Sequence, residues 1–285
     1  EFCEKKEDVD YILYPRLAAV SEAAWSAPIA KRWERFLTML DDYRERWRMK
    51  GIRSSMSEYN VKHEVVPNFG DLKMMLSCIR PDVEIRYTTD GSEPHEYSML
   101  YRRPLIIKQS QTVKCATFKD GKRLGQILAI PVHVSGVTGR NVLRSTSVER
   151  RLVNGVRGSL KNTDDEWTFW KKNDSIAVTI DVGARKRLGK VSLGYLNHFG
   201  LGIHKPQRVE VWLSDNDVHY WKATEQTFGR DEIFAEGRFT EEMELILKDV
   251  ARYVRVIMKG AGKCPEHHVR PGLEAQIYLD EVLIE

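Results

Sequence analysis

The sequence lacks several features that would place it in a common class at once. No stretch approaches the ~18 consecutive apolar residues of a membrane helix, so no membrane span is expected. The first residues carry neither an initiator Met nor an apolar signal region, and targeting information is expected upstream of residue 1. Charge of one sign is not in excess, because 45 basic and 41 acidic residues give a formal net charge of +4. A nucleic-acid partner is therefore not expected.

Cysteine is scarce and widely spaced. The four residues Cys3, Cys78, Cys115 and Cys264 include no CxxC pair, which argues against a zinc site. Cys78 and Cys115 fall in strand-like runs of one segment and could meet, although free buried thiols are the simpler interpretation. The redox compartment stays open.

Length and hydropathy permit a folded chain with a sizeable core. The 285 residues suggest two domains or three, and 42 % of them are hydrophobic. Residues 1 to about 53 show helical periodicity. Asp8 or Asp10 is a candidate cap for a first helix, and Pro15 should begin or kink its regular part.

A second helix is expected from Ser26 and Pro28 to a stop at Gly51. Its apolar residues recur in steps of three and four and form one wide stripe: Ile29, Trp33, Phe36, Leu37, Leu40, Tyr43 and Trp47. Two helices with such stripes cannot form a domain alone. They are expected to cover a surface of a larger domain whose remainder lies outside this sequence.

The rest of the chain changes to a period of two. Val83, Ile85 and Tyr87 alternate with polar neighbours, and Asp120-Gly121 predicts a tight hairpin. A small antiparallel sandwich is therefore expected over residues 54 to 135. Residues 136 to 140 resemble a linker. Residues 141 to 285 contain many short alternating runs, which predict a larger β-sandwich or jelly roll.

Three motifs carry family resemblances. Tyr14-Pro15-Arg16-Leu17-Ala18-Ala19, followed by Glu22 and Trp25, resembles the end of the catalytic barrel of glycoside hydrolase family 20, the β-N-acetylhexosaminidases. Tyr87-Thr88-Thr89-Asp90-Gly91-Ser92-Glu93-Pro94 resembles the chitobiase/β-hexosaminidase C-terminal domain. Leu152-Val153-Asn154-Gly155, Ile180-Asp181-Val182-Gly183 and Leu279-Asp280-Glu281-Val282 resemble the discoidin or coagulation-factor C-type fold, which includes carbohydrate-binding module family 32.

These resemblances imply a mainly β chain of three parts. Residues 1–53 would be two helices from the end of a (β/α)8 barrel, residues 54–135 a small antiparallel β-sandwich, and residues 141–285 a discoidin-like jelly-roll β-sandwich. The parent protein would remove terminal N-acetylhexosamine from glycans by substrate-assisted retaining hydrolysis. It would lie in the periplasm, on the cell surface or outside the cell.

The resemblance places the catalytic Asp-Glu pair after Gly-Gly, and this chain has no such string. Its Asp-Glu dipeptides, Asp165-Glu166, Asp231-Glu232 and Asp280-Glu281, are expected in surface or loop positions. The chain alone is therefore predicted to be inactive. Glu1 corresponds to the Glu of the family's Trp-x-Glu motif, which would bind sugar hydroxyls in the parent's active site.

The resemblance also implies a structural calcium ion in the C-terminal part, and no other cofactor is required. The candidate ligands are Asn154, Asp164, Asp165 and Glu281, because calcium prefers hard oxygen ligands. Asn154 stands where the family usually has Asp, which removes one charge.

Sugar binding requires an aromatic platform and fixed polar groups at one end of a sandwich. His198, Phe199 and His204 follow one strand, and His267, His268 and Arg270 precede the last strand. The two sets could converge. A transition metal is disfavoured because His267 and His268 are adjacent, and Trp167 fits the core better than a platform.

Three functions stay open. The C-terminal sandwich could bind glycans and tether the enzyme to them. The β domains could instead be purely structural, stabilising the upstream catalytic barrel of the same chain or setting oligomer geometry. A discoidin-like module could also recognise protein or lipid surfaces, which predicts exposed apolar loop tips. Sugar identity, linkage and oligomeric state are not encoded in these patterns.

Overall fold

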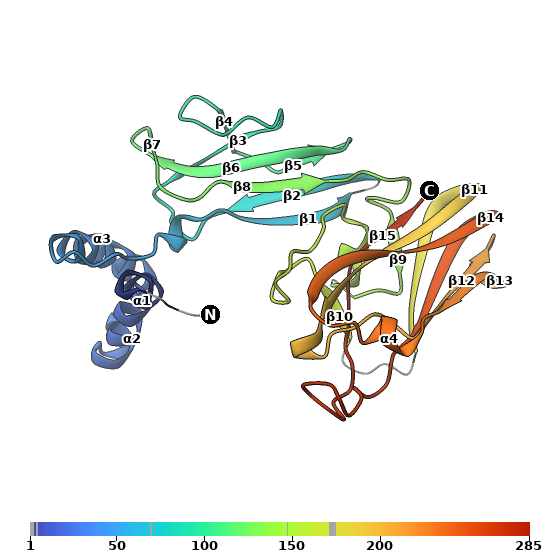
Figure 1. Ribbon diagram of the computed structural model, residues 1–285. Coiled ribbons are helices and arrows are strands. Elements are labelled where there is room, and N and C mark those ends of the chain that lie inside the picture. The colour runs from blue at the N-terminus through green and yellow to red at the C-terminus, as the bar shows by residue number, and fades with distance from the viewer. Residues whose placement is uncertain (1–2, 4, 69, 147, 171–174) are drawn as a thin grey trace.

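The computed structural model describes the chain except residues 1, 2, 4, 69, 147 and 171–174. The molecule is mainly β, with antiparallel sheets, and a helical part lies at one end (Figure 1). None of the described helices is long and apolar enough to cross a membrane. The four cysteines are free, and Cys115 is fully buried as expected, whereas Cys78 is only half-buried.

The helical part comprises α1 (Lys6–Leu13), α2 (Arg16–Trp25) and α3 (Trp33–Met49). Pro15 separates the first two helices, as predicted. Gly51 has φ +70, and the Ile52 amide donates to the Trp47 carbonyl, so α3 ends in a glycine-dependent turn.

Two predicted helix starts were wrong. Neither Asp8 nor Asp10 is the N-cap of α1, because that position is Lys5 and both Asp residues lie within the helix. The Asp8 carboxylate accepts the Lys5 amide from the first turn. The helix expected from Pro28 begins at Trp33, because Pro28–Ala30 forms a separate 3-10 turn.

The small sandwich contains two antiparallel sheets. One has the order β1 (Lys62–Asn68), β2 (Asp71–Ser77), β5 (Leu105–Ile107), and the other β4 (Met99–Leu100), β3 (Glu84–Thr88), β6 (Gln111–Lys119), β7 (Lys122–Arg123), with β8 (Leu128–Val132) paired to β6. Leu72, Met74 and Val113 are among the side chains that fill the space between them. The predicted hairpin is confirmed, since Asp120 and Gly121 both have positive φ between β6 and β7.

The larger sandwich is built around two long strands. Its elements are β9 (Asn141–Leu143), the 3-10 helix η3 (Glu149–Val153), β10 (Thr168–Trp170), β11 (Ile176–His198), the 3-10 helix η4 (Phe199–Leu201), β12 (Arg208–Ser214), β13 (Trp221–Thr227), α4 (Arg230–Ile233), β14 (Arg238–Lys259) and β15 (Ile277–Ile284). The sheet order is β10-β15-β11-β14-β12-β13, and β9 pairs with β11. The pairing of β11 with β14 shifts register between Asp181 and Lys186, beside Gly183 at φ +91. Because of this irregularity, β11 and β14 bend together and contribute to both faces of the sandwich (Figure 1).

The segment expected to be a linker is instead part of a packed seam. Val137 is fully buried and Thr138 is 3 % exposed. The Gly139 amide donates to the Val153 carbonyl, and the Gly70 amide donates to the Gly139 carbonyl. Val156 joins the small core whereas Val153 joins the large one, so this stretch ties the two sandwiches together.

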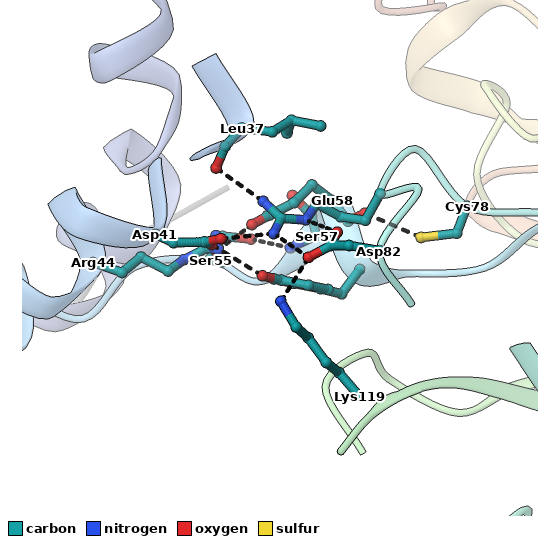
Figure 2. A network of polar contacts seen from close by, with 11 residues as sticks. Leu37, Asp41, Arg44, Ser55, Ser57, Glu58, Cys78, Asp82 and Lys119 are labelled. Carbon is teal, nitrogen blue, oxygen red and sulfur yellow. Dashed lines mark hydrogen bonds and ion pairs between the residues drawn. The ribbon is translucent and has the colours of Figure 1, made fainter. Parts of the chain in front are cut away.

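Arg80 joins the helical part to the small sandwich. Arg80 is 4 % exposed. Its guanidinium donates to the Leu37 carbonyl (3.0 Å), to Asp41 (2.7 Å) and to Asp82 (2.9 Å). Figure 2 shows these acceptors, together with Lys119, which adds a bond to Asp82. Arg80 and Lys119 hold the pKa of Asp82 at about 2.

A second guanidinium strengthens the same junction. Arg44 donates to the Ser55 carbonyl (2.7 Å) and pairs with Glu58 (Figure 2). Both guanidiniums also lie over the ring of Tyr59, with Arg80 Cζ 4.8 Å and Arg44 Cζ 5.4 Å from the ring centroid. Helix α3 is thereby held in a fixed position on the small sandwich.

Candidate functional site

The sequence-predicted sugar-binding loops meet at one end of the larger sandwich. Strand β11 ends at His198, which is paired across the sheet with Arg238 at the start of β14. The Cys264–Gly272 loop closes on itself through the Gly272 amide and the Cys264 carbonyl. Its His268 ring lies 4.1 Å from the Phe199 ring, so the two predicted sets do converge.

Beneath this surface lies a buried polar chain of Asn197, His204 and His268, each at most 3 % exposed. The Asn197 amide nitrogen donates to the carbonyls of Ala235 and Gly237, which leaves its oxygen facing His204 Nδ1 at 3.1 Å. His204 Nδ1 must therefore carry a proton, and its Nε2 is an acceptor.

The hydrogen bonds of His268 fix the position of its proton in the same way. His268 Nδ1 accepts the Arg270 amide at 2.9 Å, so its proton lies on Nε2. That Nε2 faces His204 Nε2 at 3.1 Å and donates to it. Both imidazoles are thus neutral, and every ring nitrogen of the pair has one partner of the correct kind.

This assignment corrects two predictions. His204 and His268 were expected to contact sugar, but they are buried and their ring nitrogens are satisfied within the protein. Their role is to position the layer above them. Sequence reasoning missed this because the three partners meet only in the folded chain.

The pKa of His204 is lowered to about 4 by burial and by the adjacent His268. Unfolded His titrates near 6.5, so below that pH the unfolded chain takes up a proton that the folded chain excludes. Stability is therefore complete above about pH 6.5 and falls as the pH decreases toward 4. Between pH 7.5 and pH 5 we expect a loss of about 2 kcal/mol in the free energy of unfolding from this group. Urea denaturation at the two pH values measures it.

The matched variants are His204→Gln and His219→Gln, since His219 is exposed. His204→Gln should flatten the pH dependence and His219→Gln should leave it unchanged. Equal pH dependence in His204→Gln and the wild type would show that the ring is not held neutral.

The accessible layer comprises His198 and Phe199, both half-buried, and Arg238, His267 and Arg270, all exposed. Burial, together with the positive charges of Arg238 and Arg270, lowers the pKa of His198. Its buried Nδ1 has no hydrogen-bond partner among the described residues. The surface therefore offers two guanidiniums, two imidazoles and one aromatic ring to a polyhydroxylated ligand. Arg238 was missed from the sequence, because its position beside His198 follows from strand register alone.

Trp167 belongs to the core, as the sequence favoured. It is 3 % exposed and packs with Leu196, Ile203 and Tyr278. Its indole Nε1 donates to the Ser159 carbonyl at 3.0 Å. It therefore offers no face to a ligand.

One set of three His, Cys, Asp or Glu side chains within the described residues brings potential metal ligands within 4.8 Å of one another: His204, Cys264 and His268. A metal ion between the two Nε2 atoms would need a lone pair from each ring. His268 Nε2 instead carries a proton, because Nδ1 accepts the Arg270 amide. This set is therefore a hydrogen-bonded pair beside a buried thiol.

Asn154 and Asp164, two of the four predicted calcium ligands, form hydrogen bonds within the protein. Asn154 Oδ1 accepts the Val156 amide, and its Nδ2 donates to Glu166 at 2.7 Å. Both carboxylate oxygens of Asp164 accept backbone amides, and Asp165 is exposed. Of the four, Glu281 alone presents an unpartnered buried oxygen, whereas calcium requires six to eight oxygen ligands.

Burial and the neighbouring Asp280 raise the pKa of Glu281 well above 4.5. Its other oxygen accepts the Gly155 amide at 3.0 Å.

The surface or loop assignment of the Asp-Glu dipeptides was wrong for two of the six residues. Asp280 and Glu281 lie in strand β15 at 3 % and 1 % exposure, whereas Glu166 lies in a turn, although it is only 5 % exposed. Glu166 is paired with His63 (3.1 Å) across the interdomain seam, and Asp280 with Arg157 (3.1 Å). These partners are distant in sequence, so the dipeptides alone gave no sign of burial. Glu1 lies outside the described residues.

The fold and the loop cluster define a chain of two antiparallel β-sandwich units, the second with a basic and aromatic end. Residues 74–130 match the family model described as Fn3 associated. That region runs from strand β2 to strand β8 of the small sandwich.

A β-hexosaminidase of Porphyromonas gingivalis (strain ATCC BAA-308 / W83) is 28 % identical over 135 residues, which is 46 % of this chain and 17 % of that protein. The predicted resemblance to the C-terminal part of a β-hexosaminidase is confirmed at this level. The match covers well under two thirds of the relative's length.

Two solved structures are also similar to this chain. A chitosan-binding module 1 from a chitosanase/glucanase of Paenibacillus sp. IK-5 has 13 % identity and a TM-score of 0.35, covering 54 % of this chain and 99 % of the module. The C-terminal domain of a chitobiase from Bacteroides fragilis has 15 % identity and a TM-score of 0.28, covering 47 % of this chain and 77 % of that domain.

Proposed function

We propose that this chain is the non-catalytic C-terminal region of an exo-acting β-N-acetylhexosaminidase, and that its C-terminal sandwich binds glycans. The sequence match to a β-hexosaminidase carries this proposal. The parent would remove terminal N-acetylhexosamine and would act in the periplasm, at the cell surface or outside the cell.

The helices support the idea of a larger parent domain. No residue of α1 or α2 is buried. Val20 is 63 % exposed, Trp25 88 % and Ile29 87 %, although they are large apolar side chains. Such an apolar surface is normally covered. We propose that it packs against the upstream catalytic barrel, as the family 20 resemblance implies.

Glycan binding is proposed for the surface formed by His198, Phe199, Arg238, His267 and Arg270. A half-buried aromatic ring offers its face to sugar C–H groups, and the cationic groups donate hydrogen bonds to sugar hydroxyls. The buried His204–His268 pair holds the loop that carries His267 and Arg270. Tethering through such a surface would raise the local concentration of substrate even when each contact is weak.

Calorimetric titration of the full chain with an N-acetylglucosamine trisaccharide tests this surface. Arg270→Gln should weaken binding about tenfold, because one charge-assisted hydrogen bond is lost. The control is Arg187→Gln, an exposed arginine at the bend of the same β11 strand, which should leave affinity unchanged. Absence of saturable binding to the wild type, or equal affinity in both variants, contradicts the assignment.

A purely structural role is the second candidate, and the Arg80 junction favours it. The Arg80 guanidinium donates hydrogen bonds to acceptors in α3 and in the small sandwich, which fixes the two parts together. Under this proposal the small sandwich would hold the helices against the barrel. The two roles are compatible, because they use different parts of the chain.

A further inference from the structure

A hollow of ≈ 900 Å³ opens on the small sandwich, far in sequence from the glycan surface proposed above. Its lining comes from β3 and β4 of one sheet and from β5 of the other, joined by the connection that carries Arg102 and Arg103. The volume lies in the range of ligand sites in proteins. We call it the Arg102–Arg103 groove.

The charged residues that line this groove are all basic. No acidic residue is among those that line it. Arg102 and Arg103 are exposed, and neither guanidinium forms a hydrogen bond or ion pair with any residue that the structure describes.

The other arginines of the small sandwich do have carboxylate partners. Arg80 pairs with Asp41 and Asp82, Arg86 with Glu84 and Arg123 with Glu93. Two adjacent guanidiniums without anions therefore distinguish the groove from its surroundings. Their planar donor forks match the geometry of a carboxylate or sulfate group.

The remaining lining is aromatic and apolar. Tyr87 is half-buried, Met99 is 53 % exposed and Ile106 is 47 % exposed. Such side chains suit the C–H face of a sugar ring, whereas Gln111 and Thr89 add neutral hydrogen-bonding groups. A ligand for this groove needs an anionic group, an apolar face and several hydroxyls.

We infer that the Arg102–Arg103 groove binds an acidic oligosaccharide, one that carries a uronate or sulfate group. This inference rests on the proposed function, since it assigns a second glycan site to a glycan-binding chain. The two guanidiniums hold the anionic group, and Tyr87 with Met99 contacts the ring beside it. Because the cations are exposed, binding weakens as salt rises.

The test is calorimetric titration of the full chain with a uronate tetrasaccharide and with its carboxyl-reduced neutral counterpart. The wild type should bind the uronate form at least about tenfold more tightly, which is the effect of one charge-assisted hydrogen bond. The Arg102→Gln/Arg103→Gln variant should lose that preference. Arg46→Gln, an exposed arginine on α3, should keep it.

Equal affinity for the two sugars, or an unchanged preference in the double variant, overturns the inference. Tighter binding of a tetraglutamate peptide than of the uronate tetrasaccharide overturns the ligand class. The neutral N-acetylglucosamine trisaccharide serves as the reference, because its binding should be the same in wild type and double variant. If the wild type shows the expected preference for the uronate tetrasaccharide but does not bind the trisaccharide, the proposed glycan surface of the large sandwich is contradicted. The inference about the groove is then supported.

Discussion

Replacement of Arg80 by Met should lower the free energy of unfolding of the helix–sandwich unit by about 2–3 kcal/mol. The change keeps most of the apolar stem and removes the charge. The Leu37 carbonyl then lacks its donor, and Asp41 and Asp82 lose the cation between them. Most of this loss comes from the buried Leu37 carbonyl, because the carboxylates of Asp41 and Asp82 are partly exposed and water can solvate them. Urea denaturation of the full chain, followed by tryptophan fluorescence, measures the loss.

The matched control is Arg48→Met on the same helix α3. Among the residues that the structure describes, Arg48 pairs only with Glu45 one turn away, and both side chains are more than half exposed. Exposed pairs of this kind contribute little, so the variant should behave like the wild type. Equal small effects of the two substitutions would show that the junction does not hold the helices in place.

Replacement of Trp167 by Ala should destabilise the larger sandwich by about 3–5 kcal/mol, the usual range for removing a buried aromatic side chain. The ring fills the space among Leu196, Ile203 and Tyr278. It also rests against Gly158, where an added Cβ would come within 2.4 Å of the indole. No neighbour can occupy the vacated volume without moving the backbone.

Trp25→Ala provides the comparison, because that indole is 88 % exposed. Thermal unfolding should show a clear decrease in midpoint for Trp167→Ala and almost none for Trp25→Ala. A similar decrease in both would mean that Trp167 is not the core residue that its burial indicates.

Local signals predicted the local structure well. Pro15, Gly51 and Asp120-Gly121 each act through their own backbone preferences, and each ends or turns an element where expected. The alternating apolar runs predicted β structure for the same reason, since a strand's period is visible in any short window.

Structure that depends on long-range pairing was harder to predict from the sequence. The run from Gly183 to Gly189 is polar and glycine-flanked, a pattern typical of a turn between two strands. In the structure it is the bend of the single strand β11, whose partner β14 bends with it. Strand continuity there depends on pairing with residues about sixty positions away, which no local pattern records.

The candidate site was likewise predicted only in part. Its aromatic and basic composition was predicted from the loops. The burial of His204 and His268 was not, because it depends on Asn197, on the Arg270 amide and on each other. Arg80 was missed as well, since its acceptor Asp41 lies 39 residues away.

We propose that glycans bind the end of the larger sandwich above the His204–His268 pair. Amide chemical-shift mapping of the full chain during titration with the N-acetylglucosamine trisaccharide tests this proposal. We expect the shifts to concentrate in residues 197–204, 237–239 and 264–273. Shifts concentrated at the opposite end of the sandwich, around Gly183 and Arg187, or no shifts at saturating sugar, would contradict it.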